Sequence, residues 1–126
     1  MLDRPRPKDT GAMSIIVRAE VEVQPEHLDA FHDVATQLAA ASQDEPGTIQ
    51  YRWFATGDPT AFVVIEEYVD EGTAFEHNQR CAELLDEAGR VSTLTRIQIH
   101  GDLGPDLARW IDQNPQAHGF PTLDMR

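Results

Sequence analysis

A histidine and an asparagine stand side by side, His77-Asn78, in a segment whose apolar residues recur at helical spacing. Asp70 is a suitable N-terminal cap for this helix, and Gly89 is a typical residue at a helix C-terminus. At about 100° per residue, His77 and Asn78 lie roughly 50° either side of the centre of an apolar face. That face comprises Ala74, Cys81, Leu85 and Ala88. An imidazole can transfer a proton near neutral pH, and a carboxamide can donate a hydrogen bond. His77 and Asn78 are therefore the candidate catalytic residues.

Aromatic and acidic side chains around this helix could bind a flat ligand. Two of them alternate on one face of an expected strand, two follow the apolar run 62–65, and one lies in the first turns of the helix. Tyrosine, tryptophan and phenylalanine rings stack on planar molecules, and a carboxyl group can hydrogen-bond to a hydroxyl or carbonyl. The candidate substrate-binding residues are Tyr51, Trp53, Glu66, Tyr68 and Phe75.

Each candidate also has an ordinary structural use. A histidine at the edge of an apolar helix face is usually a hydrogen-bonded boundary residue, and strand aromatics usually fill a core or a subunit interface. Glu66 and Glu67 point to opposite faces of a strand, so at most one of them enters a pocket. A salt bridge from Glu66 to Arg52 or Arg96 is the alternative to a role in binding.

No metal or cofactor motif accompanies these residues. His27 and His32 are five positions apart, about 140° around a helix, so they do not form the i, i+4 pair that holds one metal ion. The sequence has no P-loop, no dinucleotide-binding fingerprint and no Gly-x-Ser-x-Gly. We expect neither a metal nor a cofactor.

The net charge of −12 argues against nucleic acid and anionic membranes as partners, because both would repel the protein. The single cysteine, Cys81, excludes an intramolecular disulfide and fits a reducing cytoplasm. No apolar run approaches the roughly 20 residues that a membrane helix needs, and no secretory signal is visible. The expected location is cytoplasmic.

The chain divides into three parts by composition. Residues 1–13 hold two prolines, a glycine and five charges, which is typical of a disordered extension. Residues 14–103 carry regular patterns: alternation at 15–23, 48–55, 61–69 and 91–100, and helical spacing at 25–42 and 70–89. Residues 104–126 begin with a short helix at Pro105, with an apolar stripe of Leu107, Trp110 and Ile111, and end in an aperiodic tail.

The resulting order, β-α-β-β-α-β, predicts a ferredoxin-like α+β fold, with one four-stranded antiparallel sheet and two helices on one face. Two helices cover only one face of such a sheet. Because the other face still carries apolar side chains such as Phe54, we expect it to be buried in a two-fold homodimer.

Several short motifs appear in a fixed order along this pattern. Val-x-Pro-Glu stands at 23–26, Glu-Pro-Gly at 45–47, Gly-Asp-Pro at 57–59 and Glu-x-Tyr-x-Asp at 66–70, followed by Phe75 and His77. Together, over about Ile15 to Asp102, they resemble the antibiotic biosynthesis monooxygenase family, a branch of the dimeric α/β-barrel proteins. Only His77 among the candidate catalytic residues lies at a position that matches the family motif.

The resemblance implies a homodimer in which two sheets form a barrel, with a pocket between sheet and helices in each subunit. It implies a cofactor-independent monooxygenase that oxidises an aromatic quinol or anthrone with O₂. Tyr68 stands where relatives often have tryptophan, and 81–83 lacks the histidine that haem-degrading relatives need, so a haem-binding or haem-degrading protein is the less favoured reading. The alternative from another class is a non-catalytic module that binds a small ligand or a partner on the same dimeric scaffold.

Overall fold

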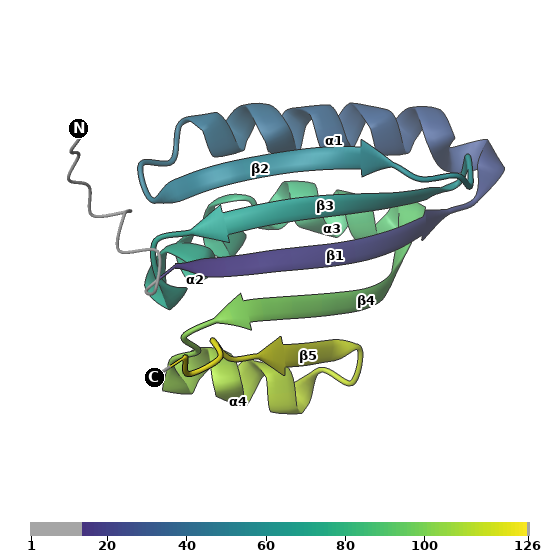
Figure 1. Ribbon diagram of the computed structural model, residues 1–126. Helices are drawn as coiled ribbons and strands as arrows, with labels where there is room; N and C mark the ends of the chain where they lie inside the picture. The colour runs from purple at the N-terminus through teal and green to yellow at the C-terminus, as the bar shows by residue number, and fades with distance from the viewer. Residues whose placement is uncertain (1–13, 126) are drawn as a thin grey trace, which may run out of the picture.

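The computed structural model describes residues 14–125, and the expected disordered extension 1–13 lies outside the described residues. Five strands form one sheet in the order β2-β3-β1-β4-β5, shown in Figure 1. Their bounds are β1 Ile15–Val23, β2 Thr48–Ala55, β3 Ala61–Tyr68, β4 Ser92–Gly101 and β5 Ala117–Phe120. The pairs β1–β3, β1–β4 and β2–β3 are antiparallel, which confirms the ferredoxin-like α+β fold predicted from the sequence.

The helices follow the predicted order. A 3-10 turn, η3 (Pro25–His27), leads into α1 (Leu28–Gln43), and α2 (Glu71–Arg80), α3 (Ala82–Val91) and α4 (Pro105–Gln113) follow. The Asp70 side chain accepts a hydrogen bond from the Thr73 backbone N–H at 2.9 Å, so it caps α2 as predicted. No helix in the described part of the chain is long and apolar enough to cross a membrane.

Two elements differ from the sequence expectation. The helix predicted over 70–89 is interrupted at Cys81, whose backbone angles (φ −101°, ψ 17°) depart from the regular helix. This change of direction lets α3 pack along α1, where Leu84 and Leu85 meet the cluster around Val34 and Leu38. The sheet also has a fifth strand, because β5 pairs in parallel with β4 within the segment expected to be an aperiodic tail.

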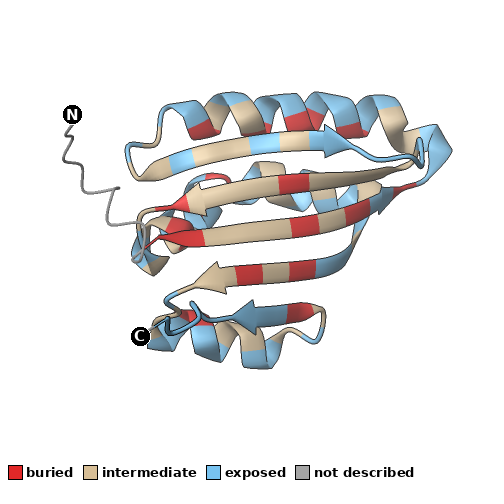
Figure 2. Cartoon of the chain, viewed as in Figure 1, coloured by how far each residue is buried: buried red, intermediate tan, exposed pale blue. Residues whose placement is uncertain are grey.

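The core lies between the sheet and the helices that cover one of its faces. Figure 2 shows the buried residues concentrated on the three middle strands, β3, β1 and β4, and on the side of α1 that meets the sheet. The inward residues of β1 are the alternating set expected from the sequence, with Ile15, Ala19, Val21 and Val23 all buried. Gly101 ends β4 at φ +124°, a conformation that suits glycine, and a Cβ there would meet the Ser14 carbonyl oxygen at 2.3 Å.

Candidate functional site

A cavity of about 510 Å³ lies between the helix-covered face of the sheet and the helices. Its wall is mainly apolar and takes side chains from β1, β2, β3, β4 and all four α-helices. The aromatic members are Phe31, Tyr51, Trp53, Phe75 and Trp110. A largely apolar cavity with a few polar groups is typical of a small-molecule site, and this volume suits a ligand of a few fused rings.

Glu66 is a carboxyl group on the cavity wall, contributed by β3. The Tyr68 hydroxyl donates a hydrogen bond to Glu66 Oε1. Burial raises the pKa of Glu66 above its ordinary value, and the hydrogen bond from Tyr68 opposes this shift only in part. A carboxyl group with a raised pKa in an apolar cavity can give or accept a proton closer to neutral pH than an exposed glutamate can.

Trp53 contributes a hydrogen-bond donor to the same cavity. Its indole Nε1–H is buried and makes no hydrogen bond among the described residues. The indole lies close enough to the Tyr51 hydroxyl to lower the pKa of that hydroxyl, but burial outweighs this effect and raises the pKa. Phe31 meets the indole edge to face, with ring centroids 5.3 Å apart, which fixes its orientation. Because a buried donor without a partner is costly, this N–H is a site where a ligand acceptor would bind.

Two tyrosine rings lie next to His77: Tyr51, which lines the cavity, and Tyr68, which lies behind the cavity wall. The His77 ring lies 5.4 Å from the Tyr51 ring and 5.4 Å from the Tyr68 ring, centroid to centroid. Burial, followed by the negative charge of Glu66, raises the pKa of both tyrosine hydroxyls, so both are neutral donors. His77 itself is 2% exposed and is not part of the cavity wall.

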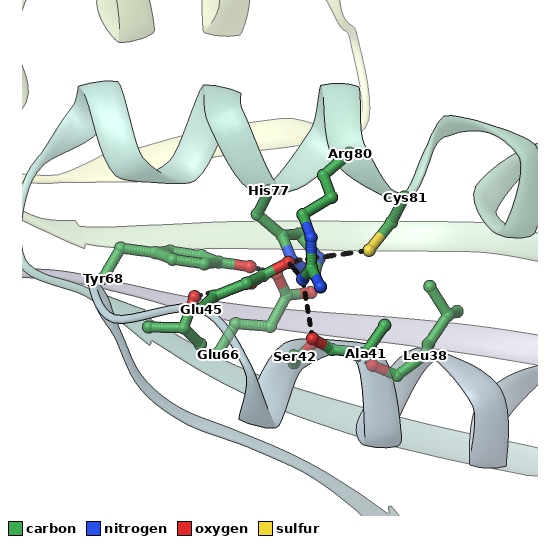
Figure 3. A network of polar contacts seen from close by, with 10 residues as sticks. Leu38, Ala41, Ser42, Glu45, Glu66, Tyr68, His77, Arg80 and Cys81 are labelled. Atoms are coloured by element: carbon green, nitrogen blue, oxygen red, sulfur yellow. Dashed lines mark hydrogen bonds and ion pairs between the residues drawn. The ribbon is translucent and has the colours of Figure 1, made fainter.

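His77 belongs instead to a polar network around Glu45, shown in Figure 3. The Glu45 carboxylate lies just beyond α1 and bonds to His77 Nδ1 through Oε1 at 2.8 Å and to Arg80 Nη1 through Oε2 at 2.8 Å. Thr48 donates a third hydrogen bond at 2.7 Å. Burial alone would raise the pKa of Glu45, but these hydrogen bonds outweigh it and hold the pKa below 4.5.

The network fixes the tautomer of His77. Because an ionised carboxylate can only accept, Nδ1 of His77 carries a hydrogen and donates it to Glu45. Arg80 also donates to the Ala41 carbonyl oxygen at 2.7 Å, which ties the end of α2 to the end of α1. The network thus holds the His77 imidazole in one orientation behind Tyr51, which lines the cavity.

The structure brings five of the seven predicted site residues into one cavity wall: Tyr51, Trp53, Glu66, Phe75 and Asn78. Tyr68 and His77 lie behind that wall and reach it through their contacts with Glu66 and Tyr51. Glu66 bonds to Tyr68 rather than forming the salt bridge with Arg52 or Arg96 that was the alternative. The roles of these residues in catalysis and binding stay predictions.

Sequence reasoning missed two groups of residues. Glu45 was noted only as part of the Glu-Pro-Gly motif at 45–47 and not as a site residue, and its contact with His77 spans 32 positions of sequence. The apolar stripe of α4 was seen, but not that Leu107 and Trp110 close one side of the cavity. The Glu71 carboxylate accepts a hydrogen bond from the Leu107 backbone N–H at 2.9 Å, which fastens α4 to the start of α2. The apolar stripe of α4 was the sequence signal that this helix covers an apolar surface of the domain.

Comparison with known proteins gives a family match and several similar structures. The model of the antibiotic biosynthesis monooxygenase family matches residues 14–82, more than half of the chain. No match to a curated protein was found.

The crystal structure of MupZ from Pseudomonas fluorescens is similar with a TM-score of 0.74 at 21% identity, covering 90% of this chain and 93% of MupZ. A conserved protein from Methanosarcina mazei Go1 has a TM-score of 0.67 at 22% identity, with 75% of this chain and 97% of that protein covered. A putative antibiotic biosynthesis monooxygenase from Nitrosomonas europaea has a TM-score of 0.65 at 22% identity, with 73% and 92% covered. At these identities the three structures show the fold alone.

Replacing Glu45 by glutamine tests the network. The depressed pKa of Glu45 means that its contribution to stability is present above its ordinary value of 4.5 and is lost as the pH falls through the folded-state pKa. We therefore expect Glu45→Gln to lower the free energy of unfolding by about 1–3 kcal/mol near pH 7. The difference should shrink at an acidic pH below the folded-state pKa of Glu45, where wild-type Glu45 is also neutral. Urea unfolding at the two pH values measures it.

The matched control is Asp106→Asn. Asp106 pairs with Arg109 at 2.8 Å, but both side chains are more than half exposed, so the change should cost less than about 0.5 kcal/mol at either pH. An equal effect of the two substitutions would contradict the structural role given to Glu45.

Proposed function

Since the chain belongs to the antibiotic biosynthesis monooxygenase family, we propose that it is a monooxygenase that oxidises an aromatic quinol or anthrone with molecular oxygen, without a metal or flavin. The observation that carries the proposal is the cavity of about 510 Å³, whose aromatic walls surround the Glu66 carboxyl group. Flat aromatic substrates fit such walls, and the chemistry needs a base in a dry site.

The reaction balances without a cofactor. An anthrone or quinol that loses a proton becomes an electron-rich anion, which can pass an electron to O₂ and then combine with the reduced oxygen. For an anthrone, one oxygen atom replaces the two hydrogens of the CH₂ group as a carbonyl oxygen. The second oxygen atom leaves with those two hydrogens as water. The protein has to accept the first proton, return protons to the departing oxygen and exclude bulk water.

In this proposal Glu66 accepts the substrate proton, because it is a carboxyl group on the cavity wall with a raised pKa. Trp53 Nε1–H and the Asn78 carboxamide donate to the substrate oxygen as negative charge develops on it. Tyr51 and Phe75 stack on the substrate rings. His77, oriented by Glu45, relays protons through the neighbouring tyrosines.

A second candidate function is a binding module that uses the cavity without chemistry. One observation favours it: His77 does not line the cavity, and its bond to Glu45 suffices as a structural reason for its presence. Against it, Trp53 and Phe75 border the cavity rather than fill it, and Phe54 is 38% exposed on the opposite face of the sheet. The enzyme is therefore our first choice.

The uncovered face of the sheet supports a homodimer. Ile16 on β1 and Val63 and Ile65 on β3 point away from the helices, since their neighbours Val64 and Ile15 point into the core. Phe54 on the adjacent strand shares this face. We propose that two copies bury these side chains sheet against sheet, because an apolar patch of this kind is unfavourable in water.

The reaction is tested by oxygen uptake. Metal-stripped protein is mixed with a panel of anthrones, naphthoquinols and catechols, and the variants Glu66→Gln and His77→Ala are measured alongside. We expect uptake with at least one substrate, and a loss in kcat of roughly 10²- to 10⁴-fold in Glu66→Gln, as for removal of a general base. His77→Ala should lower the rate as well.

Each outcome has a defined meaning. Uptake that is unchanged in His77→Ala removes His77 from the mechanism but leaves the activity. Uptake that is unchanged in Glu66→Gln contradicts the assignment of the base. Ligand binding by fluorescence, without uptake on any substrate, supports the binding module instead. Thr36→Ala changes an exposed residue on α1 and should keep the wild-type rate of oxygen uptake, so it controls for activity lost during purification of a variant.

The wall formed by α4 should limit the size of the substrate. Trp110 lines the cavity and is part-buried, so Trp110→Ala removes an indole from the wall and enlarges the space. We expect the variant to favour substrates with an additional ring over the best wild-type substrate by about 10-fold or more in kcat/KM, since even one methylene group that fits or fails to fit an apolar pocket changes transition-state binding by about 1–3 kcal/mol. Arg109 is exposed on the same helix, so Arg109→Ala should leave the order of substrate preference unchanged. An unchanged order of preference would contradict the role of Trp110.

The dimer is tested by light scattering after size-exclusion chromatography. Wild-type protein should have about twice the chain mass of 14.1 kDa. Ile65→Lys buries a charge at the proposed interface and should shift the mass to that of a monomer at micromolar concentration. Gln37→Lys, exposed on α1, adds the same charge elsewhere and should remain dimeric. A wild-type monomer would end this part of the proposal.

A further inference from the structure

Three side chains that commonly bind metal ions converge behind the cavity wall. One ligand atom from each of Glu45, His77 and Cys81 lies within 4.8 Å of the other two. His77 is 2% and Cys81 3% exposed, and the Glu45 side chain is 8% exposed. The cluster is thus buried, unlike the exposed acidic groups that gather on many protein surfaces. Figure 3 shows the imidazole, carboxylate and thiol facing one another across the α1–α2 contact.

Their spacing in the sequence suits metal binding. His77 and Cys81 are four positions apart at the end of α2, so they lie on the same side of the helix, one turn from each other. Glu45 reaches them from the segment that follows α1. Two ligands at i, i+4 on a helix and a carboxylate from a distant segment form a common three-ligand arrangement for zinc.

The distances between the donor atoms are close to those that a metal ion requires. Nδ1 of His77 is 2.8 Å from Glu45 Oε1, and Sγ of Cys81 is 3.7 Å from Glu45 Oε2 and 3.9 Å from His77 Nδ1. A tetrahedral zinc ion, with bonds of about 2.0 Å to N and O and 2.3 Å to S, needs donors about 3.3–3.6 Å apart. Shifts of about half an ångström in each separation would satisfy it. The ion would take the place of the Nδ1 proton, which would move to Nε2 of His77, and the Cys81 thiol would release its proton to solvent.

We propose that Glu45, His77 and Cys81 form a site for a divalent ion of the zinc class, with water or a small anion as the fourth ligand. Carboxylate and thiolate together neutralise the two charges of the ion, and the mixed N, O and S donors suit zinc better than magnesium or calcium. The site is separate from the substrate cavity, since neither Glu45, His77 nor Cys81 lines it. The proposal therefore does not depend on the oxygenase activity.

Arg80 is the competitor of the ion for this site. Its guanidinium pairs with Glu45 Oε2 at 2.8 Å, and its side chain is 47% exposed. An exposed arginine can turn away into solvent when a cation binds to the carboxylate. Removing the guanidinium should therefore strengthen metal binding, whereas a purely structural network would only lose stability.

Cobalt(II) titration of the full-length, metal-stripped protein tests the site. A thiolate bound to Co²⁺ gives an intense charge-transfer absorption, and Cys81 is the only cysteine of the sequence, so the band reports this residue alone. We expect the band to saturate at one Co²⁺ per chain and to disappear on addition of Zn²⁺. Cys81→Ser should abolish it, and His77→Ala should weaken Co²⁺ binding by more than about 10-fold.

Arg80→Gln is the variant that leaves all three ligands in place. It should bind Co²⁺ more tightly than wild type by about 10-fold, the effect of removing one competing cation near a partly buried carboxylate. His32→Ala, at an exposed position on α1, should have wild-type affinity. Absence of the band in both wild type and Arg80→Gln would overturn the proposal, and so would a band that His77→Ala leaves unchanged.

Discussion

The buried carboxylate of Glu45 is the interaction on which the arrangement of the helices depends. A charge in this position is costly unless it is paired, and Glu45 is satisfied only when Thr48, His77 and Arg80 all reach it. These three partners come from the start of β2 and from the end of α2. The end of α1, the first strand of the hairpin and the second helix are therefore held in one relative position by a single side chain.

This positioning has consequences for the cavity. With α2 fixed at its C-terminal end by Arg80 and His77, Phe75 and Asn78 on the same helix are presented to the cavity. The opposite side of the cavity is formed by the strands, and the small inward side chains of β1, such as Val17 and Ala19, leave space above the centre of the sheet. A rigid frame around an unfilled apolar volume is what a small-molecule site requires.

Much of the fold could be predicted because alternation and helical spacing record which face of each element is buried. The same reasoning grouped seven candidate site residues, and five of them line the cavity, while Tyr68 and His77 lie behind its wall. Sequence patterns did not predict the features that depend on tertiary contacts. β5 has four residues and a glycine, and it forms only because β4 offers an unpaired edge. Likewise, nothing local links Glu45 to His77, whose contact exists only after α1 and α2 have packed.

The central place of β1 in the sheet affects the order in which the chain can fold. β1 is synthesised before both of its neighbours in the sheet, β3 and β4, and Ile15 pairs with Gly101 near the far end of the domain. During synthesis, one edge of β1 stays without a hydrogen-bonding partner until almost all of the domain has left the ribosome. Contacts of such long range slow folding, and an open apolar strand is the usual starting point for aggregation. The unpaired strand carries three charged side chains, Arg18, Glu20 and Glu22. Charges at these positions oppose aggregation of β1 before β4 has been synthesised.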